Sequence, residues 1–267
     1  MIGSLRRALQ LLWRYRHRLR EGVTSDIRMR YAGSVLGFTW ALLYPVLLLS
    51  IYSVLYLMIF KVRPAGLAPD AYVVLVFSGL VPLLAFNESL MAATSSLLSN
   101  RSLLLNTVFP AELIPLRAIL AGQFPSLMGV IVTVIGATCL GLTHLSAIIM
   151  VPLLWVLLLM FVTGIGWVLS LVVLVARDIQ QALGLVLMVL TILSPFAYTP
   201  DMVPAAMKFV LYFNPLSYFV LSFQQVICYG TWPSWDLMLA VLALGVGSFT
   251  LGFRMFMKTK HVFFDYA

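Results

Sequence analysis

Charged side chains are scarce in this sequence: only 10% of its 267 residues are Asp, Glu, Lys or Arg, whereas 62% are hydrophobic. A soluble globular domain has about 25% charged and roughly 45–50% apolar residues. The apolar residues fall in long uncharged runs that need lipid as their solvent, and in lipid the backbone is satisfied only inside helices or closed barrels. Because the strict alternation typical of barrel strands is missing, the composition predicts an all-α membrane protein.

Catalytic and metal-binding motifs are missing as well. The sequence has no Gly-x-x-x-x-Gly-Lys-Ser/Thr loop to hold nucleotide phosphates. Its three histidines lie in different regions, so no Ser, His and Asp set and no metal-ligand cluster can be assembled. The two cysteines, Cys139 and Cys228, are interpreted as isolated apolar thiols; a disulfide between them requires a proximity that spacing cannot show. We therefore expect no enzyme activity, no metal and no bound cofactor in this chain.

Six apolar stretches are long enough to cross a hydrocarbon core of roughly 30 Å at about 1.5 Å of rise per residue. The uncharged stretch 118–176 is too long for one crossing, and we divide it at the turn-forming residues 141–146. The resulting transmembrane domain covers residues 31–257, followed by a short cytoplasmic tail, 258–267. We expect its six transmembrane helices at about 36–60, 71–93, 117–140, 147–175, 179–198 and 237–257.

A further apolar segment, 194–235, is interrupted by Pro200, Pro204 and Pro215. If it crossed the membrane, the chain would have seven spans, and the basic C-terminal residues would lie opposite the basic N-terminal stretch. With six spans, 14 of the 17 basic residues lie on one side, which the positive-inside rule identifies as cytoplasmic. We therefore expect both termini in the cytoplasm and a re-entrant helical pair that enters from outside between spans 5 and 6. Irregular backbone at that depth must be buried in protein or line a cavity, which indicates a pathway.

The formal net charge of the chain is +8, and eight of its 17 basic residues lie in residues 1–30. In a soluble protein such a charge would suggest nucleic acid as a partner, but here its position is an orientation signal, and we expect no nucleic acid partner. Leu5, Leu9, Leu12 and Trp13 recur at helical spacing and predict a cytoplasmic amphipathic helix bound to membrane lipids. This helix is either an anchor alone or a platform for a cytoplasmic partner. Its candidate functional residues are Arg6, Arg7, Trp13 and Arg14.

Five motifs follow one another along the chain: RYAGSVLGFTWALLYP at 30–45, FSGLVP at 77–82, SNRSLLLNTVFPAELIP at 99–115, RDI at 177–179 and NPLSY at 214–218. In this order they cover nearly the whole chain, and FPAELIP is the most specific single element. The sequence resembles the permease subunits of ABC exporters of the ABC-2 type, specifically those that export O-antigen, capsular polysaccharide or teichoic acid.

The resemblance implies a channel-forming subunit that moves a lipid-linked polysaccharide across a bacterial inner membrane. It also implies a homodimer of this chain with two copies of a separate cytoplasmic ABC ATPase subunit, which binds the ATP and Mg. Residues 99–115 would include the helix that docks on the ATPase, and the segment 194–235 would close the outer mouth of the channel. The residues that match the coupling elements are Asn100, Arg101, Phe109, Glu112, Arg177 and Asp178. For Arg177 and Asp178 a solvated loop between spans is an equal alternative.

Aromatic side chains are the candidates for a sugar pathway. The apolar faces of sugars pack on aromatic rings, and a tyrosine hydroxyl adds a hydrogen bond. The alternative is an ordinary aromatic belt at the membrane interface, which we favour for Trp40, Trp232 and Trp235. The candidate pathway residues are Tyr44, Tyr52, Tyr56, Phe196, Tyr198, Tyr212 and Tyr218.

Glu88 is an acid within the second expected span, and such a residue is a functional candidate by default. The alternative that we favour is a structural pair with Arg28 or Arg30 near the interface. Three other functions remain open: an ABC-2 permease for a small amphiphile such as a drug or haem, an intramembrane enzyme acting on lipid-linked sugars, and a scaffold without transport. In the enzyme, Glu88, Asp178 or Asp201 would be the acid.

Overall fold

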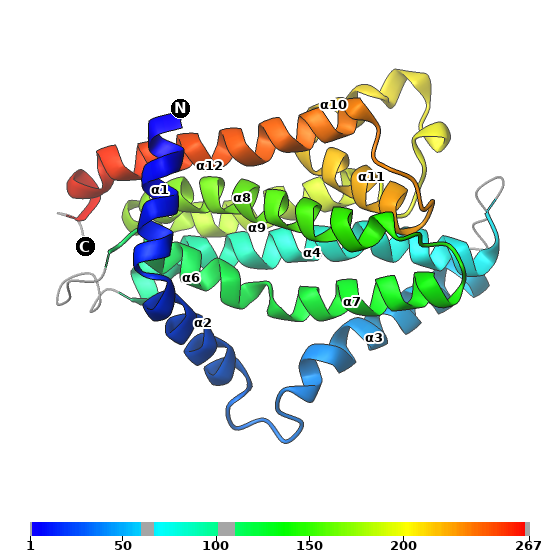
Figure 1. Ribbon diagram of the computed structural model, residues 1–267, viewed down its shortest axis with the longest axis horizontal. Coiled ribbons are helices and arrows are strands. Elements are labelled where there is room, and N and C mark those ends of the chain that lie inside the picture. Colours follow the sequence, from blue (N-terminus) through cyan, green and yellow to red (C-terminus); the bar gives the residue numbers. More distant parts are fainter. Residues whose placement is uncertain (1, 60–66, 101–109, 265–267) are drawn as a thin grey trace.

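The computed structural model describes residues 2–59, 67–100 and 110–264, and every regular element in these ranges is helical. The helices form an elongated bundle (Figure 1). Two long helices, α4 (Pro69–Ser99) and α8 (Ser146–Val175), contribute most of the buried core, and α12 (Trp235–Phe264) packs along α8. The prediction of an all-α protein is confirmed for the described residues.

Within the described ranges, five helical stretches are long and apolar enough to cross a membrane, and each matches an expected span: Thr39–Tyr56, Pro69–Ser99, Leu113–Cys139, Ser146–Val175 and Trp235–Lys260. The first comprises α3 (Thr39–Ser53) and the start of a π-helix, η1 (Val54–Ile59). The third comprises α6 (Leu113–Gly122) and α7 (Phe124–Cys139), which begins with a proline at its second residue.

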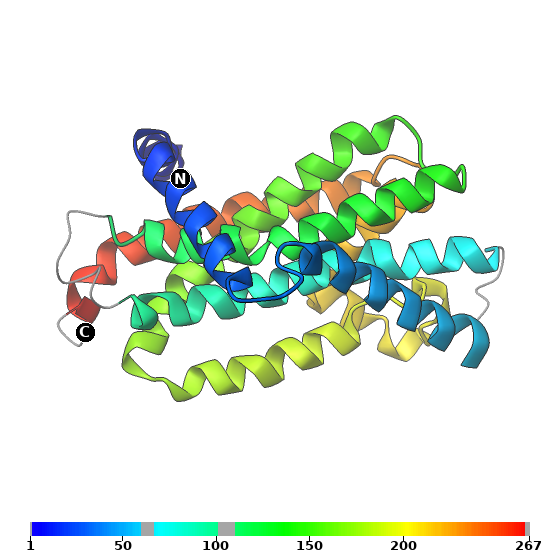
Figure 2. The same cartoon turned by 90° about the horizontal axis from the view of Figure 1, so that it is seen from below.

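The span expected at 179–198 is shorter in the structure. It is α9 (Asp178–Leu193), whose 16 residues rise only about 24 Å, less than the core thickness of roughly 30 Å. The helix ends there because Pro195 disfavours a helical conformation at Ser194, which is extended. Figure 2 shows α9 along the edge of the bundle, and Leu187 is its only buried residue.

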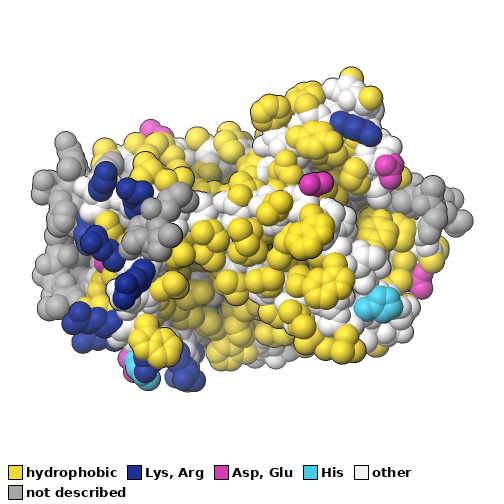
Figure 3. Space-filling view, turned by 45° about the horizontal axis from the view of Figure 1, so that its top comes forward, with side chains coloured by type: hydrophobic (Ala, Val, Ile, Leu, Met, Phe, Trp, Pro, Cys, Tyr) yellow, Lys and Arg dark blue, Asp and Glu magenta, His cyan; other side chains and the backbone are white. Residues whose placement is uncertain are grey.

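The start of α1 and the end of α12 lie at the same end of the bundle, as do the last turn of α4 and the turn between α8 and α9 (Figures 1 and 2). Lys and Arg side chains gather at this end, which we call the basic end, while hydrophobic side chains cover the middle of the face in view (Figure 3). The segment after α9 lies at the opposite end. It contains η2 (Pro200–Met202), η3 (Ala205–Met207), α10 (Phe209–Phe213) and α11 (Pro215–Ile227).

The N-terminal stretch forms two helices where one was expected, α1 (Ile2–Arg14) and α2 (Arg16–Tyr31). Ala8 of α1 is buried against Phe253 and Phe256 of α12, whereas α2 packs on α6. The expected apolar face is therefore divided: Leu5 and Leu12 join the packing with Ala8, but Leu9 and Trp13 are 54% and 71% exposed. Because α1 packs on α12 and α2 packs on α6, the chain bends between them.

Candidate functional site

Three ion pairs connect helices at the basic end among the described residues. Arg30 of α2 and Glu88 of α4 are 3.5 Å apart, and Lys260 of α12 and Glu112, just before α6, are 3.2 Å apart. Asp26 of α2 accepts hydrogen bonds from both Nε and Nη2 of Arg117 on α6. The helix α2 is thus joined to α4 and α6, and the end of α12 is joined to the start of α6.

Glu88 has the structural partner considered for it, Arg30. The distance of 3.5 Å makes this a long and therefore weak contact between Nη2 of Arg30 and Oε2 of Glu88. Both side chains are partly exposed, with 44% of Arg30 and 32% of Glu88 accessible. Charges in such a partly solvated position attract each other only modestly, so the pair can exchange partners.

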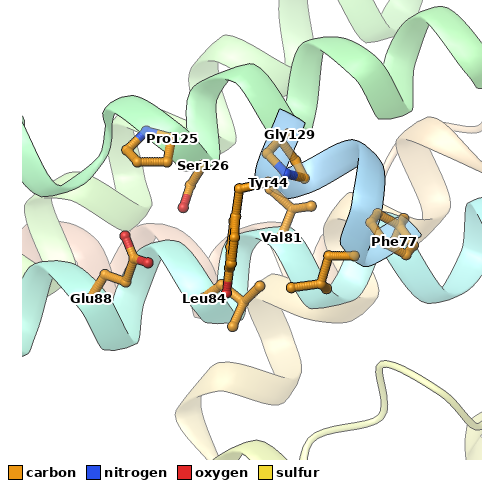
Figure 4. Close-up of a pocket in the computed structure, with 10 residues that line it drawn as sticks. Tyr44, Phe77, Val81, Leu84, Glu88, Pro125, Ser126 and Gly129 are labelled. Atoms are coloured by element: carbon orange, nitrogen blue, oxygen red, sulfur yellow. The ribbon is translucent and has the colours of Figure 1, made fainter. Parts of the chain in front are cut away.

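These two residues lie at a groove between α2, α3, α4 and α7. The groove has a volume of about 260 Å³ and is lined by Arg30, Tyr31, Trp40, Tyr44, Glu88 and Pro125, and we call it the Arg30 groove. An inner cavity of about 20 Å³ adjoins it and shares Tyr44, Glu88 and Pro125. Figure 4 shows Tyr44, Glu88 and Ser126 around this cavity, each from a different helix. The inner cavity has room for about one water molecule.

The rim of the Arg30 groove is held by an aromatic cluster. The ring of Tyr31 lies 5.4 Å from that of Phe38 and 6.4 Å from that of Phe124, measured between ring centroids. The turn between α2 and α3 that brings Phe38 into place needs the left-handed backbone of Gly33 and Gly37, with φ of 76° and 50°. Burial raises the pKa of Tyr31 above its ordinary value of 10.0, so its hydroxyl remains a hydrogen-bond donor at neutral pH.

Two of the candidate pathway tyrosines, Tyr52 and Tyr56, lie together. Their rings stack with centroids 5.9 Å apart, and they contact Phe77 and Tyr72 of α4 at 6.3 and 5.8 Å. The hydroxyl of Tyr72 donates to the carbonyl oxygen of Ala197 at 2.7 Å. This aromatic cluster therefore connects α3 and η1 to the segment that follows α9. Sequence reasoning missed Tyr72 and Phe77, because their position in a span does not show which helix they face.

The segment after α9 is held to the bundle by two buried amides. Nε2 of Gln224, on α11, lies 3.0–3.3 Å from the carbonyl oxygens of Leu75, Pro195 and Phe196. Asn214 caps α11 by accepting from the backbone N–H of Leu216, and its Nδ2 donates to Oγ of Ser194 at 2.8 Å. The sequence shows both amides only as polar residues in an apolar segment, and it does not indicate their partners.

The other candidate aromatics lie in this same segment. Phe196 packs against the main core, and the hydroxyl of Tyr198 donates to the carbonyl of Leu193 at 2.6 Å. Tyr212 is exposed, and its carbonyl accepts a hydrogen bond from the hydroxyl of Tyr218 at 3.1 Å. Tyr44, by contrast, lines the Arg30 groove. The candidate pathway residues thus divide between the two ends of the bundle.

The candidate coupling residues are only partly described. Arg101 and Phe109 lie outside the described residues. Asn100 follows α4 and donates to the carbonyl of Ser96, and Arg177 and Asp178 are exposed at the start of α9. Glu112 is only 3% exposed, is paired with Lys260, and has its backbone carbonyl bonded to the indole N–H of Trp167. Its side chain therefore joins helices within the chain.

On α1 the three candidate arginines, Arg6, Arg7 and Arg14, are all exposed. The guanidinium of Arg16 stacks on one face of the exposed indole of Trp13, 4.3 Å from the ring centroid. The cysteines do not pair: Cys139 is exposed at the end of α7, and Cys228 is buried after α11. Glu88, Asp178 and Asp201, the acids considered for an enzyme, lie on three separate elements.

Known proteins are similar in sequence to this chain over most of its length. An O-antigen export system permease protein RfbA from Klebsiella pneumoniae is 27% identical over 240 residues, covering 90% of both chains. A protein of the same name from Myxococcus xanthus is 23% identical over 242 residues, covering 90% of this chain and 91% of the relative. The sequence profile described as ABC-2 type transporter matches residues 22–228, well over half of the chain. The chain is an integral membrane protein that belongs to the ABC-2 type transporter family.

Proposed function

We propose that this chain is the channel-forming permease subunit of an ATP-driven exporter that moves a lipid-linked polysaccharide, of O-antigen or capsule type, across the bacterial inner membrane. The observation that supports it most is the alignment with O-antigen export permeases along 90% of both lengths. Because the alignment covers most of both chains, the similarity extends beyond the number of spans. This favours the same mode of transport in this chain and in those permeases.

The proposed topology has six crossings, with α9 as a short fifth. Two observations support this count: five helices of the described residues have spanning length, and the start of α1 and the end of α12 lie together at the basic end, as an even number of passes would leave them. In this arrangement the basic end is cytoplasmic, because Lys and Arg concentrate on the cytoplasmic side. The segment from Ser194 to Trp235 then enters the membrane from outside and returns. Its buried amides, Asn214 and Gln224, satisfy the irregular backbone that such a segment exposes.

The proposed assembly is a homodimer with two cytoplasmic ABC ATPase subunits that bind the ATP and Mg. Two apolar helices are left largely uncovered by this chain alone: α3 buries only Ala41 and Pro45, and α9 buries only Leu187. A second copy covers part of these faces, and lipid covers the rest. Asn100, Arg177 and Asp178 lie at the basic end and are the described residues available for contact with the ATPase. The exposed arginines of α1 bind anionic lipid beside them.

The proposed pathway runs beside the stacked pair of Tyr52 and Tyr56 to the outer segment. Their flat rings pack on sugar faces, and their hydroxyls exchange hydrogen bonds with sugar hydroxyls as the polymer moves. The ring of Tyr72 contacts Tyr56, and its hydroxyl donates to the carbonyl of Ala197 in the segment after α9. Movement of this segment during opening is therefore coupled to movement of the tyrosine pair on α3 and η1.

The decisive test is deletion and complementation in the source bacterium, with surface polymer measured by immunoblotting. Deletion should abolish surface polymer and leave lipid-linked polymer inside the cell, and the intact gene should restore export. Affinity purification of the complementing protein should recover an ABC ATPase subunit. Surface polymer at the normal level in the deletion strain, or purification without any ATPase, would refute the proposal. Loss of a small exported amphiphile in place of polymer would support the alternative permease function.

A further inference from the structure

The helix α9 has few apolar contacts with the rest of the chain. Leu187 is its only buried residue, and Leu183 and Leu190 are partly buried against the main core. Residues 178–186, which form more than half of the helix, include no buried side chain. Because no hydrophobic effect presses helices together in lipid, the orientation of α9 depends on a small number of polar contacts.

Two hydrogen-bonded contacts attach α9 to its neighbours near the end of the helix. On one side, Nδ2 of Asn87 on α4 donates to Oγ1 of Thr191 at 2.8 Å. On the other side, Nδ2 of Asn214 donates to Oγ of Ser194 at 2.8 Å and lies 3.3 Å from the carbonyl oxygen of Leu190. Two points of attachment fix the direction of a rigid helix, whereas one point leaves it able to turn.

The contact between Asn87 and Thr191 lies inside the membrane-spanning part of the bundle. Asn87 is 12 residues before Ser99, the last residue of α4, and Thr191 is 13 residues after Asp178, the first residue of α9. Both of these helix ends lie at the basic end (Figure 2). At about 1.5 Å per residue, the contact is therefore about 18–20 Å from the basic end, within a core of roughly 30 Å. While it is closed, bulk water does not compete for this hydrogen bond.

The hydrogen-bonding groups of the pair favour opening as well as closure. The hydroxyl of Thr191 also donates to the carbonyl of Leu187 at 2.7 Å, so it keeps a partner when Asn87 is withdrawn. Oδ1 of Asn87 is buried and has no hydrogen-bond partner in the described structure, so the closed state leaves this acceptor unsatisfied. Opening breaks one hydrogen bond and lets water reach both atoms of the amide. A small difference in free energy between two states is what a switch requires.

The backbone at both ends of α9 allows the helix to turn. Ala176, before the helix, has φ of −122° and ψ of 90°, and Ser194, after it, has φ of −80° and ψ of 139°, so both are extended. Hinge motions are absorbed by a few such residues at the ends of elements. Because Asn214 holds Ser194, the outer end of α9 stays in place. The end that is free to move is the one beside Arg177, at the basic end.

We propose that Asn87 and Thr191 form a latch that sets the angle of α9. While the hydrogen bond is closed, α9 lies along α4; when it opens, α9 turns about its attachment to Asn214, and residues 178–186 move away from α4. The use of this motion in export rests on the proposed function, whereas the latch itself does not.

The first test measures hydrogen exchange of α9 in the full-length permease, with any ATPase that co-purifies, in nanodiscs. Asn87→Leu and Thr191→Val remove the latch and should each raise exchange of residues 178–193 about threefold or more, the factor that corresponds to one hydrogen bond between membrane helices. Thr191→Ser keeps the hydroxyl and should stay within about twofold of the unchanged protein. Unchanged exchange in both Asn87→Leu and Thr191→Val, or an equal rise in Thr191→Ser, would overturn the latch.

A matched threonine controls for the loss of a hydroxyl in a spanning helix. Thr133 on α7 is buried and donates to the carbonyl of Gly129 at 2.8 Å, as Thr191 donates to that of Leu187. In the described structure it accepts no hydrogen bond from another helix. Thr133→Val should therefore leave the exchange of α9 unchanged, and a rise equal to that in Thr191→Val would count against the latch.

A locked latch distinguishes a moving part from a static contact. Asn87→Cys and Thr191→Cys, in a Cys139→Ser and Cys228→Ala background, are joined by a short bismethanethiosulfonate, and mass spectrometry measures how much of the protein is linked. The link should lower exchange of α9 and stop the appearance of new surface polymer, and a reducing agent should restore both. Normal export with the link complete would overturn the proposed motion. If the unlinked protein exports no polymer, the proposed function fails, and hydrogen exchange alone decides the latch.

Discussion

The backbone carbonyl of Gly164 on α8 occupies the space in which a Cβ of Gly252 on α12 would stand. Two turns toward the start of each helix the approach is also close, since a Cβ at Gly245 would lie 2.8 Å from the carbonyl oxygen of Leu157. Small residues permit such close packing between membrane helices, where no hydrophobic effect drives association. The close packing of α12 on α8 therefore requires glycine, whose side chain is a single hydrogen atom, at positions 245 and 252.

Alanine at Gly252 should destabilise the protein. The added methyl group meets backbone atoms of α8, which cannot move aside as a flexible side chain can, and overpacking of this kind costs about 1–3 kcal/mol. Thermal unfolding in detergent, followed by size-exclusion chromatography, measures the change. Gly247→Ala is the matched control on the same helix, because a Cβ there meets no atom within 4 Å. Equal melting temperatures for the two variants would contradict this account of the α8–α12 contact.

Five of the six expected spans match long apolar helices of the described residues, because a membrane-crossing helix needs an apolar stretch that is visible in the sequence. The partner of Glu88 could be limited to Arg28 or Arg30 because an acid at that depth needs a nearby cation. The short length of α9 was missed although Pro195 signalled it, since the apolar residues continue past the proline. Hydropathy does not distinguish an apolar helix from an apolar loop, because both are buried in lipid or protein. Only the effect of Pro195 on the backbone of Ser194 shows that the helix ends there.

The rotation of each helix about its axis could not be predicted. Tyr52 and Tyr56 were candidates by spacing, but their contact with Tyr72 depends on which face α4 presents to α3. In lipid both faces of a helix are apolar, so periodicity carries little information on orientation. The same limit explains why Leu9 and Trp13 were assigned to one apolar face with Leu5, whereas α12 covers only part of it.

Replacement of Gln224 by leucine should loosen the segment after α9. The substitution removes the buried donor from the carbonyl oxygens of Pro195 and Phe196, and each unsatisfied group costs about 1–3 kcal/mol. The carbonyl of Leu75 keeps the hydrogen bond from the hydroxyl of Ser78. Hydrogen exchange of residues 194–213 should rise, with α8 unchanged. Gln225→Leu is the comparison, since its amide makes an exposed bond to the backbone of Ser234, which water can replace. Unaltered exchange in Gln224→Leu would show that apolar packing alone holds the segment.

Loss of Lys260 should affect stability far more than loss of Lys258, its exposed neighbour on α12. Lys260→Met leaves the buried carboxylate of Glu112 without its partner, a change that costs about 3 kcal/mol or more, whereas Lys258→Met removes a solvated charge. The double variant Glu112→Leu with Lys260→Met should regain most of the loss, because two apolar side chains need no partner. Thermal unfolding of the three variants and the unchanged protein measures this recovery, and a double variant as unstable as Lys260→Met would contradict it.

The two natural cysteines test the proposed topology without an inserted reporter. Cys139 is exposed at the end of α7 away from both termini, so a membrane-impermeant maleimide should label it from outside in spheroplasts. Cys228 is buried, so the reagent cannot reach its thiol, and it should remain unlabelled until the protein is denatured. Lys258→Cys in a Cys139→Ser background should react only after the membrane is permeabilised. Labelling of position 258 in sealed spheroplasts would place the basic end outside and refute the assignment of both termini to the cytoplasm.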